Sequence, residues 1–205
     1  MGKLEANKQQ KLTSLLNTAF NLFTTQGVAK TSIAEISQKA GIAKGTFYLY
    51  FKDKYDIRNR LISHESSKLF KNAVADLEEF SMEKDEQLGF EEKIIFIINH
   101  IVDELNSNQT LLTFISKNLS WGIFKEALTT KVASDDINFK DVYYEMINAE
   151  DISLEEPEIM LFLIVELVSS TCYRAILYKE PADIDTIKPY LFKTVRAIIR
   201  EHTIR

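Results

Sequence analysis

Cysteine, glycine and proline are all scarce in this chain. Its 205 residues include 1 Cys, 6 Gly and 3 Pro. The lone Cys172 excludes an intrachain disulfide and a thiolate metal cluster, because both need more than one thiol. The shortage of glycine and proline argues against the many tight turns of a β-sandwich or barrel. Since Leu, Ile, Lys, Glu and Ala are abundant instead, the composition predicts an all-α fold.

Long hydrophobic runs are also lacking. The longest apolar run, from Ile159 to Val165, is far shorter than the roughly 20 residues that span a bilayer. The segment from Met1 to Gln10 is polar and has no apolar core of the kind found in signal peptides. These patterns predict a cytoplasmic location and no membrane partner.

The charge is unevenly divided along the chain. The net charge of −5 argues, as an average, against a nucleic-acid partner. Residues 1–54, however, hold eight lysines and three acidic residues, a net charge of +5, which leaves −10 for the remainder. A basic head on an acidic body suits a module that binds phosphates, although chance variation of surface charge would give the same counts.

An amphipathic helix is expected near the N-terminus. Apolar residues follow the spacing i, i+3, i+4, i+7, i+8 and i+11, which places them on one helix face. They are Leu12, Leu15, Leu16, Ala19, Phe20 and Phe23. Gly27, just beyond this stripe, is a typical helix-ending residue.

A helix-turn-helix is predicted after this first helix. Ser32 and Glu35 have the spacing of a capping box, in which each side chain accepts from the other residue's amide. The second helix would begin at Ser32 and end at Gly41, and a short third helix would run from about Lys44 to Tyr50. Asp53 then stands as the N-cap of a long fourth helix.

Two segments of this region resemble the DNA-binding signature of TetR/AcrR regulators. They read Thr31-Ser32-Ile33-Ala34-Glu35-Ile36 and Ala40-Gly41-Ile42-Ala43-Lys44-Gly45-Thr46-Phe47-Tyr48-Leu49-Tyr50-Phe51-Lys52-Asp53-Lys54. With matching positions in the first helix, the resemblance covers roughly residues 9 to 60. Ala43 departs from it, because Ser or Thr commonly caps the recognition helix there. Such a cap is worth about 1 kcal/mol.

The resemblance implies an all-α transcriptional regulator with a three-helix DNA-binding head and a larger helical body. Residues 1–54 would form the helix-turn-helix domain, and residues 55–205 the effector-binding and dimerisation domain. It further implies a repressor that binds a near-palindromic operator as a homodimer, paired through its last two helices. A small-molecule effector would release it, and no cofactor is implied.

Eight residues of the head are expected to contact DNA. Those on the leading turns of the third helix would enter the major groove, and the others would bind phosphate. The set is Thr31, Ser32, Lys44, Gly45, Thr46, Tyr48, Tyr50 and Lys54. Tyr50 could equally face inward, and the resemblance places Lys54 at a backbone phosphate. Because Lys44 is the only strong guanine reader among them, DNA shape is expected to contribute to specificity.

The rest of the chain is expected to be helical. The fourth helix would be broken near residues 63–67, and the helix over residues 90–105 would be central, since it is apolar nearly all round. Ser153 and Glu156 suggest another capping box, and Pro189 suggests that the last helix starts near Lys188. The remaining helices are expected over residues 109–131, 137–148 and 157–178, with the last ending near His202.

The body offers candidates for a ligand pocket, which needs apolar walls and a few polar groups. They are Phe96, His100, Phe114, Trp121, Phe124, Tyr143, Glu166, Ser170 and Tyr173. The last three fall within about 40° of one helix face. Aromatic residues at helical spacing are also what an ordinary core contains, so core packing explains the same set. If the pocket exists, its effector is expected to be apolar or aromatic.

Catalytic motifs are missing. The chain has no Gly-x-Ser-x-Gly elbow, phosphate loop or His-Glu-x-x-His pair. His100, Asp103 and Glu104 could present metal ligands from one helix, but surface charge explains them more simply. We therefore expect no enzyme and no metal site. The alternatives are a DNA-binding adaptor with a vestigial pocket, controlled by a protein partner, and a small helical enzyme.

Overall fold

The fold is all-α, as predicted, in a computed structural model that describes residues 3–84, 88–118, 139–150 and 152–204. Within these ranges there is no strand, only an isolated bridge between Leu154 and Thr203. The helices are α1 (Lys3–Gln26), α2 (Ile33–Lys39), α3 (Lys44–Phe47), α4 (Lys54–Lys84), α5 (Phe90–Ser107), α6 (Gln109–Asn118), α8 (Phe139–Asn148), α9 (Pro157–Leu177) and α10 (Ile184–His202).

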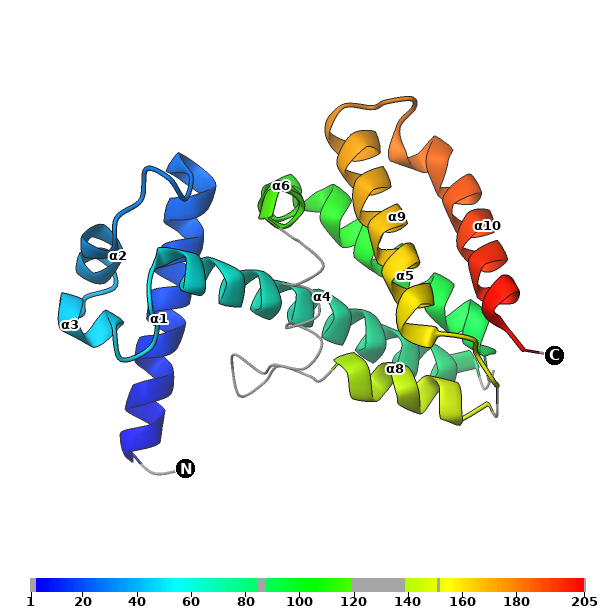
Figure 1. Ribbon diagram of the computed structural model, residues 1–205, viewed down its shortest axis with the longest axis horizontal. Coiled ribbons are helices and arrows are strands. Elements are labelled where there is room, and N and C mark those ends of the chain that lie inside the picture. The colour runs from blue at the N-terminus through cyan, green and yellow to red at the C-terminus, as the bar shows by residue number, and fades with distance from the viewer. Residues whose placement is uncertain (1–2, 85–87, 119–138, 151, 205) are drawn as a thin grey trace.

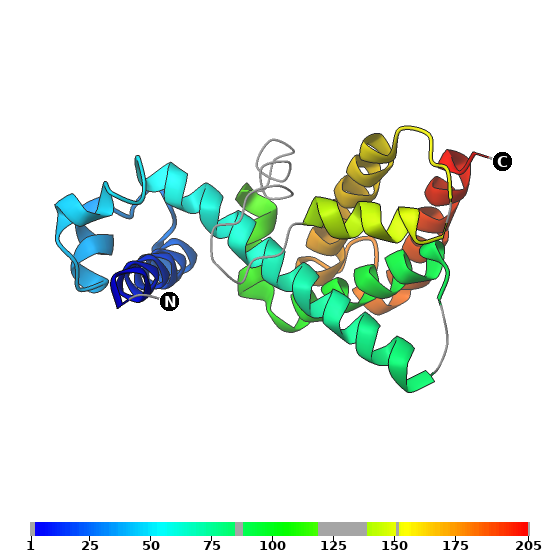
Figure 2. The same cartoon turned by 90° about the horizontal axis from the view of Figure 1, so that it is seen from below.

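The helices form a small head and a larger body joined by α4. In Figure 1, α1, α2 and α3 gather at one end, and α4 runs from them along the body. The helices α5, α8, α9 and α10 pack at the far end, where α9 and α10 lie side by side, and α6 lies between them and the head. Figure 2 shows the same separation from below. α4 is one unbroken helix of 31 residues, so the break expected near residues 63–67 is wrong.

The head is held by the apolar stripe that the sequence predicts. Leu15 and Ala19 of α1, Ile36 of α2 and Phe47 of α3 are all fully buried in a common core. Gly27 and Gly41 have positive φ angles of 84° and 71°, the backbone conformation that favours glycine after a helix.

The starts of the last two helices differ from the sequence prediction. The N-cap of α9 is Glu156, which lies in the left-handed region (φ 46°) and makes no side-chain cap, so Ser153 does not form the expected capping box. α10 begins at Ile184, before the expected Lys188, because the Asp183 carboxylate accepts a hydrogen bond from Thr186 N at 2.9 Å. Pro189 therefore lies inside α10 and removes one backbone hydrogen bond from it.

α9 is the most apolar helix of the body. Its 21 residues are long and apolar enough to cross a membrane by length and composition, with a mean hydropathy of 1.7. The uninterrupted apolar run in the sequence is much shorter than this helix, because Glu166 ends it directly after Val165. Buried core helices meet the same criteria, and α9 contributes Met160, Ile164 and Cys172 to the core.

Candidate DNA-binding face and internal cavity

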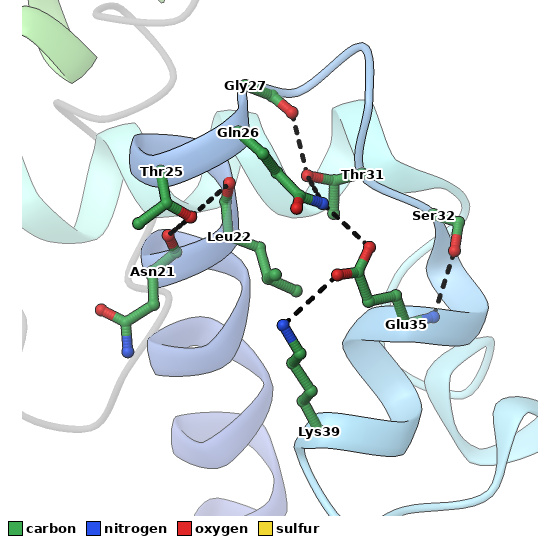
Figure 3. A network of polar contacts seen from close by, with 9 residues as sticks. All are labelled: Asn21, Leu22, Thr25, Gln26, Gly27, Thr31, Ser32, Glu35 and Lys39. Carbon is green, nitrogen blue, oxygen red and sulfur yellow. Dashed lines mark hydrogen bonds and ion pairs between the residues drawn. The ribbon is translucent and has the colours of Figure 1, made fainter.

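The start of α2 is fixed by its cap and by a polar network shown in Figure 3. Ser32 Oγ accepts from Glu35 N at 3.1 Å, as predicted for a capping box. The Glu35 carboxylate is held mainly by Gln26, whose Nε2 donates to it at 2.9 Å, and by Lys39 at 3.3 Å. The hydrogen bond from Gln26 is the main reason that the pKa of Glu35 lies below its usual value. The network ties α2 to the end of α1.

Thr31 is not placed to touch DNA, which corrects the sequence prediction. Its side chain is 1% exposed, and its hydroxyl donates to Gly27 O at 2.9 Å. The same hydroxyl accepts from Gln26 Nε2 at 3.3 Å. Thr31 therefore holds the turn before α2, whereas Ser32 beside it is exposed.

α3 is shorter than predicted, ending at Phe47 instead of Tyr50. Its N-cap is Ala43, which makes no side-chain hydrogen bond, as the departure from the family pattern implied. Helical winding continues beyond the assigned end, since Phe51 N donates to Phe47 O at 3.0 Å. Phe47 and Phe51, four positions apart, are both buried, and they orient the segment on the head.

The outer side of this segment carries most of the predicted contact residues. Lys44, Gly45 and Tyr48 are exposed, and Thr46 is half-buried. Tyr50 is half-buried, with its hydroxyl donating to Lys8 O on α1 at 3.4 Å.

Leu49 was missed by the sequence prediction. It is 82% exposed, although the apolar residues two positions to either side of it are buried. The sequence signal that could have predicted its exposure is its position midway between Phe47 and Phe51, because residues two positions apart lie on nearly opposite sides of a helix.

The side chain of Lys54 forms hydrogen bonds within the head. Its Nζ donates to three backbone carbonyl oxygens of the turn between α1 and α2: Val28 at 2.9 Å, Ala29 at 3.0 Å and Thr31 at 3.2 Å. These hydrogen bonds engage all three donors of the ammonium group. In this conformation Lys54 fastens the start of α4 to the turn, so the phosphate contact implied by the resemblance is not preformed.

The body forms a cavity of about 170 Å³, partly open to the surface, between α4, α5, α6, α8 and α9. Its described lining is mostly aliphatic, with residues such as Ile97, Ile98 and Val168, and includes no charged side chain. Its polar groups are the hydroxyls of Ser66, Ser67, Ser116, Ser169 and Tyr143 and the thiol of Cys172.

The two titratable groups of this lining are neutral at physiological pH. Burial raises the pKa of the Tyr143 hydroxyl well above its usual value, and that hydroxyl donates to Pro157 O at 3.0 Å. Burial also raises the pKa of the Cys172 thiol to about 12. The cavity therefore suits an uncharged, apolar group.

Of the described pocket candidates, only Tyr143 lines this cavity. Phe114 on α6 packs edge-on against Phe20 of α1 at 5.3 Å between ring centroids, so it joins body to head. Phe96 packs against Phe80 of α4, with ring centroids 5.3 Å apart. These rings serve helix packing, which is the alternative that the sequence left open.

His100 also lies away from the cavity. Its Nδ1 is 2.9 Å from the Asp76 carboxylate of α4, and its Nε2 is 3.4 Å from Glu104 without hydrogen-bond geometry. It lines a shallow surface groove with Asp103, and Asp103 pairs with Lys188. No group of His, Cys, Asp and Glu suited to a metal ion occurs in the described parts of the chain.

The predicted face of α9 points outward. Glu166 and Ser170 are exposed, and the Tyr173 hydroxyl lies 3.1 Å from that of Tyr178. The opposite side of the helix faces the cavity instead. Two other candidates, Trp121 and Phe124, lie outside the described residues.

These features define a helix-turn-helix protein of the kind that binds DNA, with an internal cavity in a separate helical body. Residues 15–61 match the family model for bacterial regulatory proteins of the TetR family. A curated relative, the HTH-type transcriptional regulator AcrR of Shigella flexneri, is 40% identical over 55 residues. That alignment covers 27% of this chain and 26% of the relative. Over residues 15–61 the chain therefore carries a DNA-binding segment similar to that of the TetR family.

Solved structures share the whole fold. A TetR family transcription regulator from Shewanella sp. PV-4 superimposes with a TM-score of 0.66 over 95% of this chain and 99% of that one, at 15% identity. Thermus thermophilus FadR, a TetR family transcriptional repressor in complex with lauroyl-CoA, gives 0.60 over 95% and 96%, at 16% identity. At these identities the likeness establishes the fold, while the match to AcrR spans about a quarter of that relative's length.

Proposed function

We propose that this protein is a transcriptional repressor of the cytoplasm that binds a near-palindromic operator as a homodimer and leaves it when an effector binds. The observation that carries the proposal is the exposed face of the α3 segment on a basic head, whose aromatic residues Phe47 and Phe51 are locked in the core. Residues 1–54 are the DNA-binding domain and residues 55–205 the effector and dimerisation domain.

The dimer is proposed to form through α9 and α10. One head covers only one half-site, so a near-palindrome requires two symmetric heads. Large apolar side chains on these helices are open to solvent: Ile159 and Leu163 on α9 and Tyr190 on α10. A second copy packed on this face would cover apolar surface that the single chain leaves exposed.

The effector is proposed to be an uncharged, largely apolar small molecule held in the cavity. Its volume of about 170 Å³ exceeds that of an engineered 150 Å³ cavity that binds benzene, so it accommodates a ring or a section of an alkyl chain. The lauroyl-CoA bound by the Thermus thermophilus protein makes an acyl chain a specific candidate. The serine hydroxyls would orient one polar group of such a ligand.

Two helices connect the cavity with the head. α4 contributes Ser66 and Phe70 to the cavity and carries Lys54 at its start. α6 contributes Leu112 and Ile115 to the cavity, while Phe114 of the same helix touches the head. A ligand that favours one position of these helices would shift the heads between operator-binding and released arrangements.

The test is selection of duplexes from a random pool by the purified protein, followed by measurement of affinity for the winner as salt is raised. A dimer that contacts several phosphates should show the logarithm of affinity falling steeply with that of salt concentration. Acyl and aromatic compounds are then added to the complex, and release by an uncharged apolar member supports the effector assignment. A pool from which no sequence is enriched above bulk DNA would refute the regulator function.

A further inference from the structure

Leu49 is the most exposed large hydrophobic residue in the described parts of the chain, at 82%. Its position is unexpected, because it lies between Tyr48 and Tyr50 on the head and not on the apolar face of α9 and α10. Water around such a side chain disfavours the unbound state, so a partner that covers it would gain affinity. The neighbouring chemistry indicates what that partner is.

Leu49 occupies the outermost position of the recognition segment. Leu49 N donates to Thr46 O at 3.2 Å, so helical winding includes this residue. At about 100° per residue, its side chain points roughly 160° away from both Phe47 and Phe51. Both of these phenylalanines are buried. The anchoring of the segment on the head therefore directs Leu49 away from the protein.

The surface around Leu49 allows another molecule to come close. Gly45, one turn earlier on the same face, has open space where a side chain would begin, with no atom within 4 Å of an added Cβ. Lys44 and Lys52, at either end of the segment, are both exposed. The surface thus has a glycine beside one apolar side chain, with a lysine on either side. These features are complementary to a groove that is anionic at its edges and has one apolar group inside it. A second copy of this basic surface would be repelled.

The major groove of DNA has that chemistry. Phosphates line its edges, and the C5 methyl group of thymine is the apolar group that the bases present inside it. The minor groove presents no such methyl.

We propose that Leu49 reads the C5 methyl group of a thymine in each operator half-site, giving the head an apolar contribution to specificity beside Lys44. The inference rests on the proposed DNA binding. It assigns part of the specificity to a direct contact that does not need hydrogen bonds. Cytosine at the same position would lack the methyl and be discriminated against.

The experiment removes single methyl groups from the DNA. The full-length protein first selects its operator, and each thymine of the winning duplex is then replaced in turn by deoxyuridine, which keeps every hydrogen-bonding group. Affinities are measured by fluorescence anisotropy at one fixed salt concentration for the wild type, Leu49→Ala and Leu49→Met. Met82→Ala is the matched control, because Met82 is equally exposed, at 81%, but lies near the far end of α4.

Replacing the contacted thymine of a single half-site should weaken wild-type binding by about fourfold, the value expected for one lost apolar carbon. The same replacement should leave binding by Leu49→Ala nearly unchanged, while Leu49→Met and Met82→Ala should keep the wild-type response. Circular dichroism should show equal helix content and thermal midpoints for all variants, since Leu49 makes little contact in the free protein.

Equal effects of uracil on wild type and Leu49→Ala would overturn the assignment of Leu49 while leaving sequence-specific DNA binding in place. A selected site without any uracil-sensitive thymine would do the same. Failure to enrich any sequence would instead refute the proposed function, and the Leu49 inference with it. The three results are therefore distinguishable within one series of measurements.

Discussion

Replacing Lys54 with methionine tests whether its ammonium group stabilises the head or binds DNA. Met keeps the apolar stem but cannot donate to the carbonyls of Val28, Ala29 and Thr31. A hydrogen bond to a charged group contributes about 1.5–3 kcal/mol. Three bonds from one half-buried ammonium do not add, because each competes with the hydration of the same charge, so we expect a loss of about 2 kcal/mol for the set.

The assay is urea and thermal unfolding of the free protein at fixed concentration, followed by circular dichroism. For a chain of this length, about 2 kcal/mol corresponds to a midpoint lower by about 4–8 °C. Lys52→Met is the matched control, because Lys52 is an exposed lysine of the same segment, and it should leave the midpoint nearly unchanged. The result that would refute our reasoning is an unchanged midpoint for Lys54→Met together with weaker operator binding and a shallower salt dependence. That outcome would show that Lys54 serves a phosphate, as the family resemblance implied.

Three further predictions concern caps and the cavity. Ala43→Ser should raise the free energy of unfolding by about 1 kcal/mol, measured in urea, because it supplies the missing cap of α3; no gain would mean that the end amides of α3 already have equivalent partners in water. The pKa of Asp183 is lowered by its hydrogen bonds with Thr186, so its contribution to stability is present above its unfolded value near 3.8 and is lost as pH falls through the lower folded value. Asp183→Asn should therefore remove this part of the acid sensitivity in unfolding curves, and identical pH profiles for both proteins would contradict it. Val168→Phe should fill part of the cavity and abolish release by an apolar effector while operator selection persists; normal release would place the ligand elsewhere.

The head could be predicted in detail because its determinants are local in sequence. The stripe of α1, the Ser32 cap and the burial of Phe47 and Phe51 follow from helical spacing and capping chemistry within a few residues. Lys54 shows the limit of this reasoning. Its carbonyl partners lie 23 to 26 positions earlier, and only the folded turn brings them together.

The cavity was predicted poorly because the sequence does not say which face of a helix turns inward. Glu166, Ser170 and Tyr173 do share a face, but the cavity lies against the opposite side of α9. The polar groups at the cavity include Ser66 and Ser67 of α4, which the sequence pattern did not single out. Small hydroxyl residues at helix positions that pack in the core carry little signal before the packing is known.

The unbroken α4 gives the molecule a lever. At about 1.5 Å per residue, its 31 residues extend over about 46 Å, from the turn of the head to the far end of the body. A tilt of about 5° along such a rod displaces its tip by about 4 Å, slightly more than the rise of one base pair. In a dimer with two heads, a small rearrangement of the cavity wall that tilts α4 would thus change the separation of the two recognition segments. They would then no longer fit successive major grooves of one duplex.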